Sequence, residues 1–135
     1  MSVADGSQFD RNIYMDNIGA LHFGVWNSGP QQTDSAAGFN DSNWHQVMGS
    51  LSASTGLSLY VDGVLAGNDP AVTSAQVNYN GYWRFGEDNL NNWPYQPASH
   101  YFHGQIDEVA VFSTAISSGN VAAIYAAGSA GMCKP

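Results

Sequence analysis

The chain has 135 residues, 44% of them hydrophobic and 10% charged, which predicts one folded domain and excludes intrinsic disorder. Its formal net charge is −8 and its three cations are Arg11, Arg84 and Lys134, so it offers no basic stripe to a nucleic acid. No apolar run approaches the roughly 20 residues of a membrane-spanning helix, and the first residues lack the pattern of a signal peptide.

Short alternating runs separated by turn residues predict strands of a sandwich or barrel. The first hairpin is expected to join residues 12–15 to residues 20–26, with Leu21, Phe23 and Val25 on one face of its second arm. The sequence contains no repeat and no linker that would divide it, so we expect a single domain over residues 1–135.

The middle of the chain is expected to begin with a polar loop over residues 27–42 and a strand over residues 44–51. Trp44 leads this strand, and we expect its large ring to pack between the sheets. A strand over residues 57–61 follows, with its alternate apolar residues facing inward. Asp62-Gly63 then predicts a hairpin, because a two-residue type I′ turn needs a positive φ at both positions.

The last part of the chain is less regular. Weak strands are expected at residues 77–79 and 82–85, followed by a long loop from residue 87 to residue 101. Residues 102–112 predict a long strand with apolar residues on both faces, or a strand with a bulge near its acidic pair. A helix is expected over residues 117–126, and its candidate cap residues and apolar stripe are Ser117, Gly128, Val121, Ile124 and Tyr125.

Three motifs now stand in order: Trp44-His45-Gln46-Val47, Leu59-Tyr60-Val61-Asp62-Gly63 and the segment 102–112, followed by Ala115-Ile116-Ser117. Their order and spacing resemble the laminin G-like group of the concanavalin A-like lectin/glucanase superfamily. The resemblance covers residues 9–127 and leaves residues 128–135 as a tail. It implies an all-β antiparallel sandwich of jelly-roll topology with one short C-terminal helix.

This chain departs from that family at its front. Family members usually begin with several more strands before the segment that matches residues 9–26. The resemblance therefore implies a sandwich with unpaired strand edges, and we expect a homodimer that closes them.

The most binding-like segment lies in the loop from residue 87 to residue 101. Aromatic rings can support the apolar face of a sugar while amide and imidazole groups bind its hydroxyls. The candidate ligand-binding residues are Trp93, Tyr95, Asn91, Asn92, His100 and Tyr101. The alternative is that Trp93 and Tyr95 fold inward and cap the sandwich.

Asp107 and Glu108 raise the question of catalysis. Glycosidases of this superfamily use a Glu-x-Asp-x-x-Glu strand with two catalytic carboxylates. Aligning Asp107 with the central aspartate places Gln105 and Ala110 at the glutamate positions, and neither can ionise, so we expect no enzyme. Asp107 either accepts backbone N–H groups at a strand bend or, with Asp88, binds a structural calcium ion of the kind that related modules often hold.

The resemblance implies a non-catalytic recognition module that binds a carbohydrate or a glycoprotein surface. Two alternatives are a structural or assembly protein whose sandwich another chain completes, and a degenerate glucanase. The resemblance also implies an extracellular location, although no signal peptide is visible in this chain.

Overall fold

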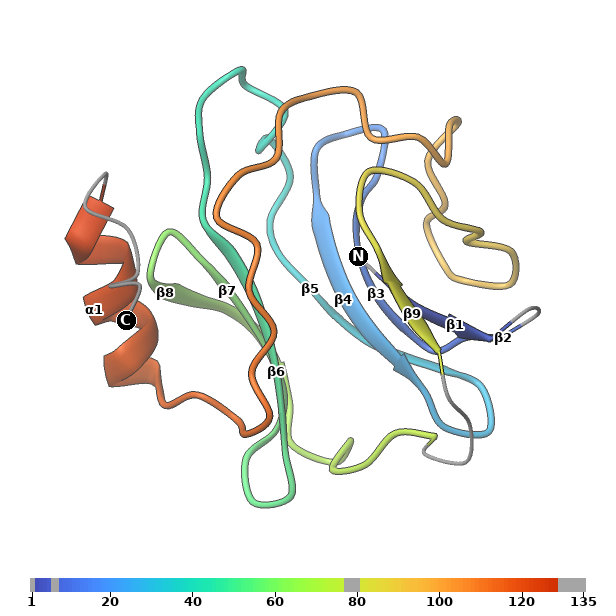
Figure 1. Cartoon of the computed structure of the whole chain (residues 1–135), viewed down its shortest axis with the longest axis horizontal. Helices are drawn as coiled ribbons and strands as arrows, with labels where there is room; N and C mark the ends of the chain where they lie inside the picture. The colour runs from blue at the N-terminus through green and yellow to red at the C-terminus, as the bar shows by residue number, and fades with distance from the viewer. Residues whose placement is uncertain (1, 6–7, 77–80, 129–135) are drawn as a thin grey trace.

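The computed structural model describes residues 2–5, 8–76 and 81–128, and these form nine strands and one helix (Figure 1). The predicted strand at residues 77–79 and residues 129–135 of the predicted tail lie outside the described residues. The elements are β1 (Ser2–Asp5), β2 (Gln8–Phe9), β3 (Arg11–Met15), β4 (Leu21–Trp26), β5 (Pro30–Asp34), β6 (Val47–Ser52), β7 (Gly56–Val61), β8 (Val64–Asp69), β9 (Tyr82–Arg84) and α1 (Ser118–Ala127).

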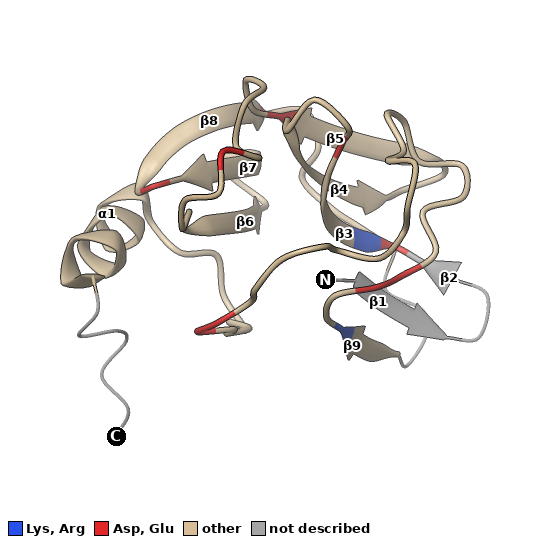
Figure 2. Ribbon diagram, turned by 90° about the horizontal axis from the view of Figure 1, so that it is seen from above, with Lys and Arg blue, Asp and Glu red and all other residues tan. Residues whose placement is uncertain are grey.

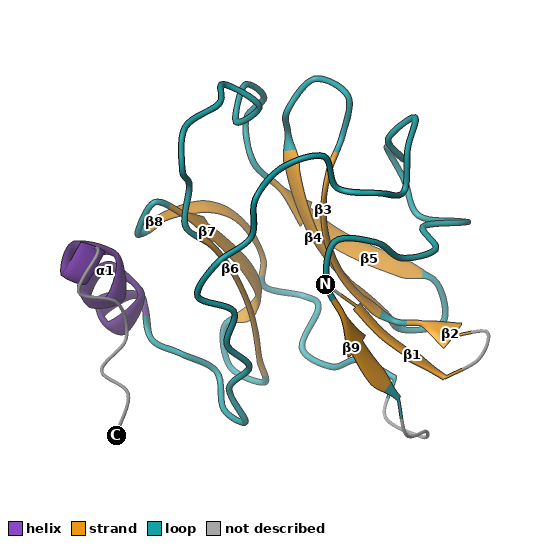
Figure 3. Ribbon diagram, turned by 45° about the horizontal axis from the view of Figure 1, so that its top comes forward, coloured by secondary structure: helices purple, strands orange, loops and turns teal. Residues whose placement is uncertain are grey.

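Three antiparallel sheets of three strands make up the fold, with strand orders β2–β1–β9, β3–β4–β5 and β6–β7–β8 (Figure 3). β5 and β8 lie against each other, so the second and third sheets meet along one side. Strands in antiparallel sheets with one short helix confirm the all-β class that the sequence predicts.

The core lies between β4 and β7, the central strands of the second and third sheets. Both strands are buried on their two faces, and their inward apolar residues pack together as the alternation predicts. β6 approaches closely at Gly49, where an added Cβ would lie 2.6 Å from the ring of Phe23. The buried members of this cluster are Leu21, Phe23, Val25, Leu57, Leu59, Val61 and Val72.

The predicted type I′ hairpin joins β7 to β8. Asp62 has a φ of 51° and Gly63 a φ of 78°, so both central residues adopt the left-handed conformation that this turn requires. The residues on either side of the turn, Val61 and Val64, pair directly. The turn chemistry therefore sets the register of the hairpin.

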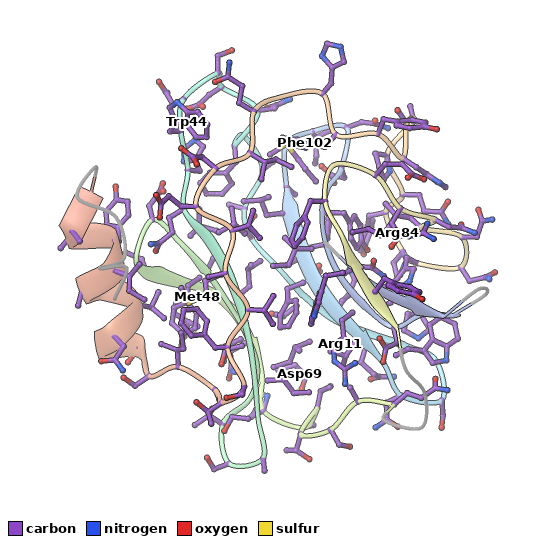
Figure 4. The ribbon with its side chains drawn as sticks, viewed as in Figure 1. Arg11, Trp44, Met48, Asp69, Arg84 and Phe102 are labelled. Atoms are coloured by element: carbon purple, nitrogen blue, oxygen red, sulfur yellow. The ribbon has the colours of Figure 1, made fainter. Side chains whose placement is uncertain are left out.

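Two predictions for the middle of the chain are wrong. Residues 30–34, expected in a loop, form β5, which pairs with β4 along its whole length. Trp44, expected in the core, is 65% exposed and lies at the rim of the molecule (Figure 4). β6 begins only at Val47, and the half-buried side chain of His45 turns towards Asp62 instead, so the neighbouring indole faces solvent.

The long strand predicted over residues 102–112 is also absent. The amide of Phe102 donates to the carbonyl of Gly86 (2.7 Å), and Tyr101 forms an isolated bridge with Glu87. Beyond that point the described residues 103–116 have no regular secondary structure, and Glu108 has a φ of 51°. Strand propensity alone does not make a strand where no neighbouring strand pairs with it.

The helix is confirmed in position. Ser117 is its N-cap and accepts a hydrogen bond from the amide of Asn120 (3.2 Å), and Gly128 follows its last residue. Of the predicted apolar stripe only Val121 is buried, whereas Tyr125 is 48% exposed and lies against Gly63. Among the described residues no helix is long and apolar enough to cross a bilayer.

Candidate binding surface

The outer face of the β3–β4–β5 sheet carries a connected group of aromatic and polar side chains. Because side chains alternate along a strand, β4 directs Phe23 into the core and His22 and Gly24 outward. The register aligns Tyr14, His22 and Asp34 in one row across the sheet. We call Tyr14, His22, Gln32 and Asp34 the polar row, and the loop from residue 87 to residue 101 covers it in part.

Trp93 anchors this loop to the sheet. Its ring lies over Gly24, where an added Cβ would overlap the indole. It makes edge-to-face contacts with Tyr14 (centroids 6.3 Å apart, 67°) and Trp26 (6.0 Å, 70°). Trp93 is 3% exposed, so it belongs to the core and does not offer its ring to a ligand. Of the two alternatives that the sequence left open for Trp93, the structure has the one in which the ring folds inward.

Tyr95 lies on the same loop but faces solvent. It is 65% exposed, with a φ of 51°. Its ring stacks on His22 (centroids 5.4 Å apart, 17°), and His22 stacks in turn on Tyr14 (4.8 Å, 22°). These three rings form a column that leads from the buried sheet outward. Since His22 covers one face of the Tyr95 ring, the opposite face is the one open to solvent.

Hydrogen bonds fix the polar row. The Tyr14 hydroxyl lies 2.7 Å from the Pro94 carbonyl oxygen and 2.8 Å from Gln32 Oε1, and its single hydrogen donates to one of them. Gln32 Nε2 donates to Asp34 Oδ1 (2.7 Å). Burial, followed by the nearby aspartate charges, raises the pKa of Tyr14, so its hydroxyl stays protonated and can donate.

His22 connects this row to the turn between β3 and β4. Its Nδ1 lies 2.7 Å from Asp34 Oδ1, and its Nε2 lies 3.4 Å from Asp16 Oδ2 without a hydrogen-bond partner. Asp16 Oδ1 also accepts the amides of Ile18 and Ala20. Burial acts to raise the pKa of Asp16, but these two amides and His22 outweigh it and lower the pKa, so Asp16 is held as a carboxylate.

The other residues predicted to bind a ligand lie outside the polar row. Asn91 and Asn92 are exposed, and the Asn91 amide donates to Asn89 Oδ1 (2.9 Å). His100 is half-buried, and Tyr101 is 71% exposed where its backbone pairs with Glu87. Only Tyr95 of the predicted set contacts the polar row with an open ring. Sequence analysis missed Gln32 and Asp34 because it assigned β5 to a loop.

The two aspartates predicted to bind calcium lie in different surroundings. Asp88 is buried, its Oδ1 accepts the Asn89 amide (2.7 Å), and its Oδ2 has no hydrogen-bond partner. Burial is the main cause that raises the pKa of Asp88. Asp107 is exposed and accepts the amide of Glu108 (2.8 Å). The described part of the chain contains no group of three or more His, Cys, Asp or Glu side chains that could hold a metal ion, and calcium stays a prediction.

Charge is distributed unevenly over the molecule. Figure 2 shows basic residues on β3 and β9, and acidic residues on many of the turns and loops. Arg11 pairs with Asp10 (3.0 Å), and Arg84 lies 3.6 Å from Asp88. Both described cations are therefore engaged, and the remaining described carboxylates give the molecule its acidic surface.

A second histidine, His45, also lies between two aspartates. Its Nδ1 is 2.7 Å from Asp62 Oδ2 in the β7–β8 turn, and its Nε2 is 3.0 Å from Asp41 Oδ1. Hydrogen bonds to Asp62 and then Asp41 raise the pKa of His45, and bonds from Asn43 and His45 lower the pKa of Asp41 to about 2. This contact joins the segment before β6 to the hairpin.

Antiparallel sheets with one short helix define an all-β module of the sandwich class. The sequence matches the profile of the Concanavalin A-like lectin/glucanases superfamily over residues 1–122, and the chain belongs to this superfamily. This match confirms the laminin G-like family that the three sequence motifs predicted.

The fold is also similar to a known crystal structure. An S-layer domain-containing protein from Clostridium thermocellum superposes with a TM-score of 0.54 at 18% sequence identity. The alignment covers 90% of this chain and 66% of that one, so the present chain spans less than two thirds of its length. A search of curated proteins gave no significant match.

Proposed function

We propose that this module binds a neutral carbohydrate on the open face of Tyr95, next to the polar row. The family's lectin-like fold supports a non-catalytic binding module. The observation that carries the proposal is the ring of Tyr95, which is 65% exposed and backed by the buried ring of His22. A ring held in this way can bind a ligand without first losing side-chain freedom.

The chemistry of the surface suits a sugar. The apolar C–H face of a pyranose stacks on an aromatic ring, and its hydroxyls need hydrogen-bond acceptors and donors beside that ring. Asp34, whose side chain is 40% exposed, supplies a carboxylate acceptor, and Gln32 holds that carboxylate in place. The carboxylates of Asp34 and Asp16 and the net charge of −8 disfavour sulfated or carboxylated sugars, which is why the proposal specifies a neutral one.

Binding to a glycan array tests this proposal, with wild type and two tyrosine variants compared side by side. Tyr95→Ala removes the stacking ring and should weaken binding to neutral glycans by up to about tenfold. Tyr101→Ala is the matched control, because Tyr101 is an equally exposed tyrosine outside the polar row, and it should bind as wild type does.

Two outcomes would contradict the proposal. The first is that wild type binds no neutral glycan, and the second is that Tyr95→Ala binds neutral glycans as tightly as wild type does. Asp34→Asn keeps the shape of the side chain and removes its charge, so it should relax the exclusion of acidic sugars. Melting curves of each variant separate lost binding from lost folding.

A further inference from the structure

The segment from residue 103 to residue 116 leaves its backbone unpaired. In the part of the chain that the structure describes, no backbone–backbone hydrogen bond joins residues 103–116 to any strand. Within the segment, the Glu108 amide donates to the side chain of Asp107 (2.8 Å). Figures 1 and 3 show this segment running alongside β6, which pairs with β7 on one edge only. Unpaired donors and acceptors therefore lie beside an open strand edge.

The side chains of this segment are half-covered. They are β-branched and aromatic residues, the types that favour a strand. Each is about half exposed: Ile106 (49%), Val109 (48%), Val111 (50%) and Phe112 (46%). Half-exposed apolar side chains beside unpaired backbone are typical of a surface that another chain covers.

Asp107 and Glu108 add a charge to this surface. Both are exposed, and neither forms an ion pair with a described residue. Arg11 and Arg84 cannot neutralise them, because each already lies beside an aspartate. A second copy of this chain would place the same carboxylates, and a net charge of −8, against this edge. The charges thus favour a basic partner over the homodimer expected from the sequence.

We propose that residues 105–112 straighten at Glu108, whose φ is 51° in this structure, and accept an extended strand from a different chain, with alternating apolar residues and with Lys or Arg opposite Asp107 and Glu108. Strand addition supplies main-chain hydrogen bonds for affinity, and the side chains supply specificity. The surface is separate from the polar row, so this proposal stands or fails independently of carbohydrate binding.

Hydrogen–deuterium exchange with two designed peptides tests the proposal on the whole chain. One peptide alternates valine with threonine and lysine, and the control carries glutamate in place of each lysine. At low salt the lysine peptide should slow amide exchange within residues 103–112, and the glutamate peptide should not. The double variant D107N/E108Q should bind the lysine peptide about two- to fivefold more weakly for each charge removed.

Three outcomes would overturn the proposal. The first is that neither peptide slows exchange. The second is that both peptides slow it equally, which would indicate general apolar adhesion. Exchange could also slow with rising protein concentration and no peptide, which would show that a second copy covers the edge. Val111→Pro gives an independent check: removing this backbone donor should abolish the protection by the lysine peptide and leave the melting temperature unchanged.

Discussion

Replacing Trp93 with alanine tests whether this side chain anchors the loop from residue 87 to residue 101. Trp93 is 3% exposed and contacts Tyr14 and Trp26 edge to face. Truncating a buried tryptophan costs about 3–5 kcal/mol. For 135 residues an unfolding entropy of about 2.1 cal/mol/K per residue gives about 0.28 kcal/mol/K, so the melting temperature should fall by about 11–18 °C.

Differential scanning calorimetry measures this fall, and Tyr95→Ala is the matched control on the same loop. Tyr95 is mostly exposed, so its truncation removes mainly the stack on His22, about 0.5–1.5 kcal/mol, and should lower the melting temperature by about 2–5 °C. Equal falls for the two variants, or a larger fall for Tyr95→Ala, would refute the assignment of Trp93 to the core.

The remaining predictions concern three other sites. Gly24→Ala places a Cβ against the indole ring above it and should destabilise the domain by about 1–3 kcal/mol, visible as a lower melting temperature and a changed near-UV spectrum. Hydrogen bonds to Asp62 and Asp41 raise the pKa of His45 above 6.5. The stabilisation that these contacts give the folded state is therefore complete below about pH 6.5 and is lost as the pH rises through the pKa of His45 in the folded state. The stability difference between wild type and His45→Gln should therefore shrink with rising pH, and a pH-independent difference in melting would argue against the ion pair. Ser117→Ala removes the helix N-cap and should cost about 1 kcal/mol, and unchanged helical ellipticity and melting would show that the cap is dispensable.

Local chemistry made the hairpins and the helix predictable from the sequence. Asp62-Gly63 is one of few pairs that accept positive φ at two successive positions, and the structure has 51° and 78° there. Ser117 can cap a helix whether or not anything packs on it. Leu57 and Leu59 are buried because strict alternation fixes which face of β7 meets the core.

The errors arose where a distant partner decides the outcome. β5 has a polar sequence of low strand propensity, and its pairing with β4 makes it a strand. Residues 102–112 have the opposite character, with high propensity and no described strand that pairs with them. Trp93 could have been assigned to the core from Gly24, because a glycine inside an otherwise bulky strand often marks a site of close approach.

β8 meets β5 at Gly67, where an added Cβ would overlap the backbone oxygen of Asp34. β8 is tied to the core through β7, whereas β5 carries Gln32 and Asp34 of the polar row. A side chain at position 67 would push β5 outward and displace these two groups without touching a ligand. We therefore expect a larger residue at position 67 to weaken the proposed sugar binding indirectly, because it would shift β5 and not because it would remove a contact with the ligand.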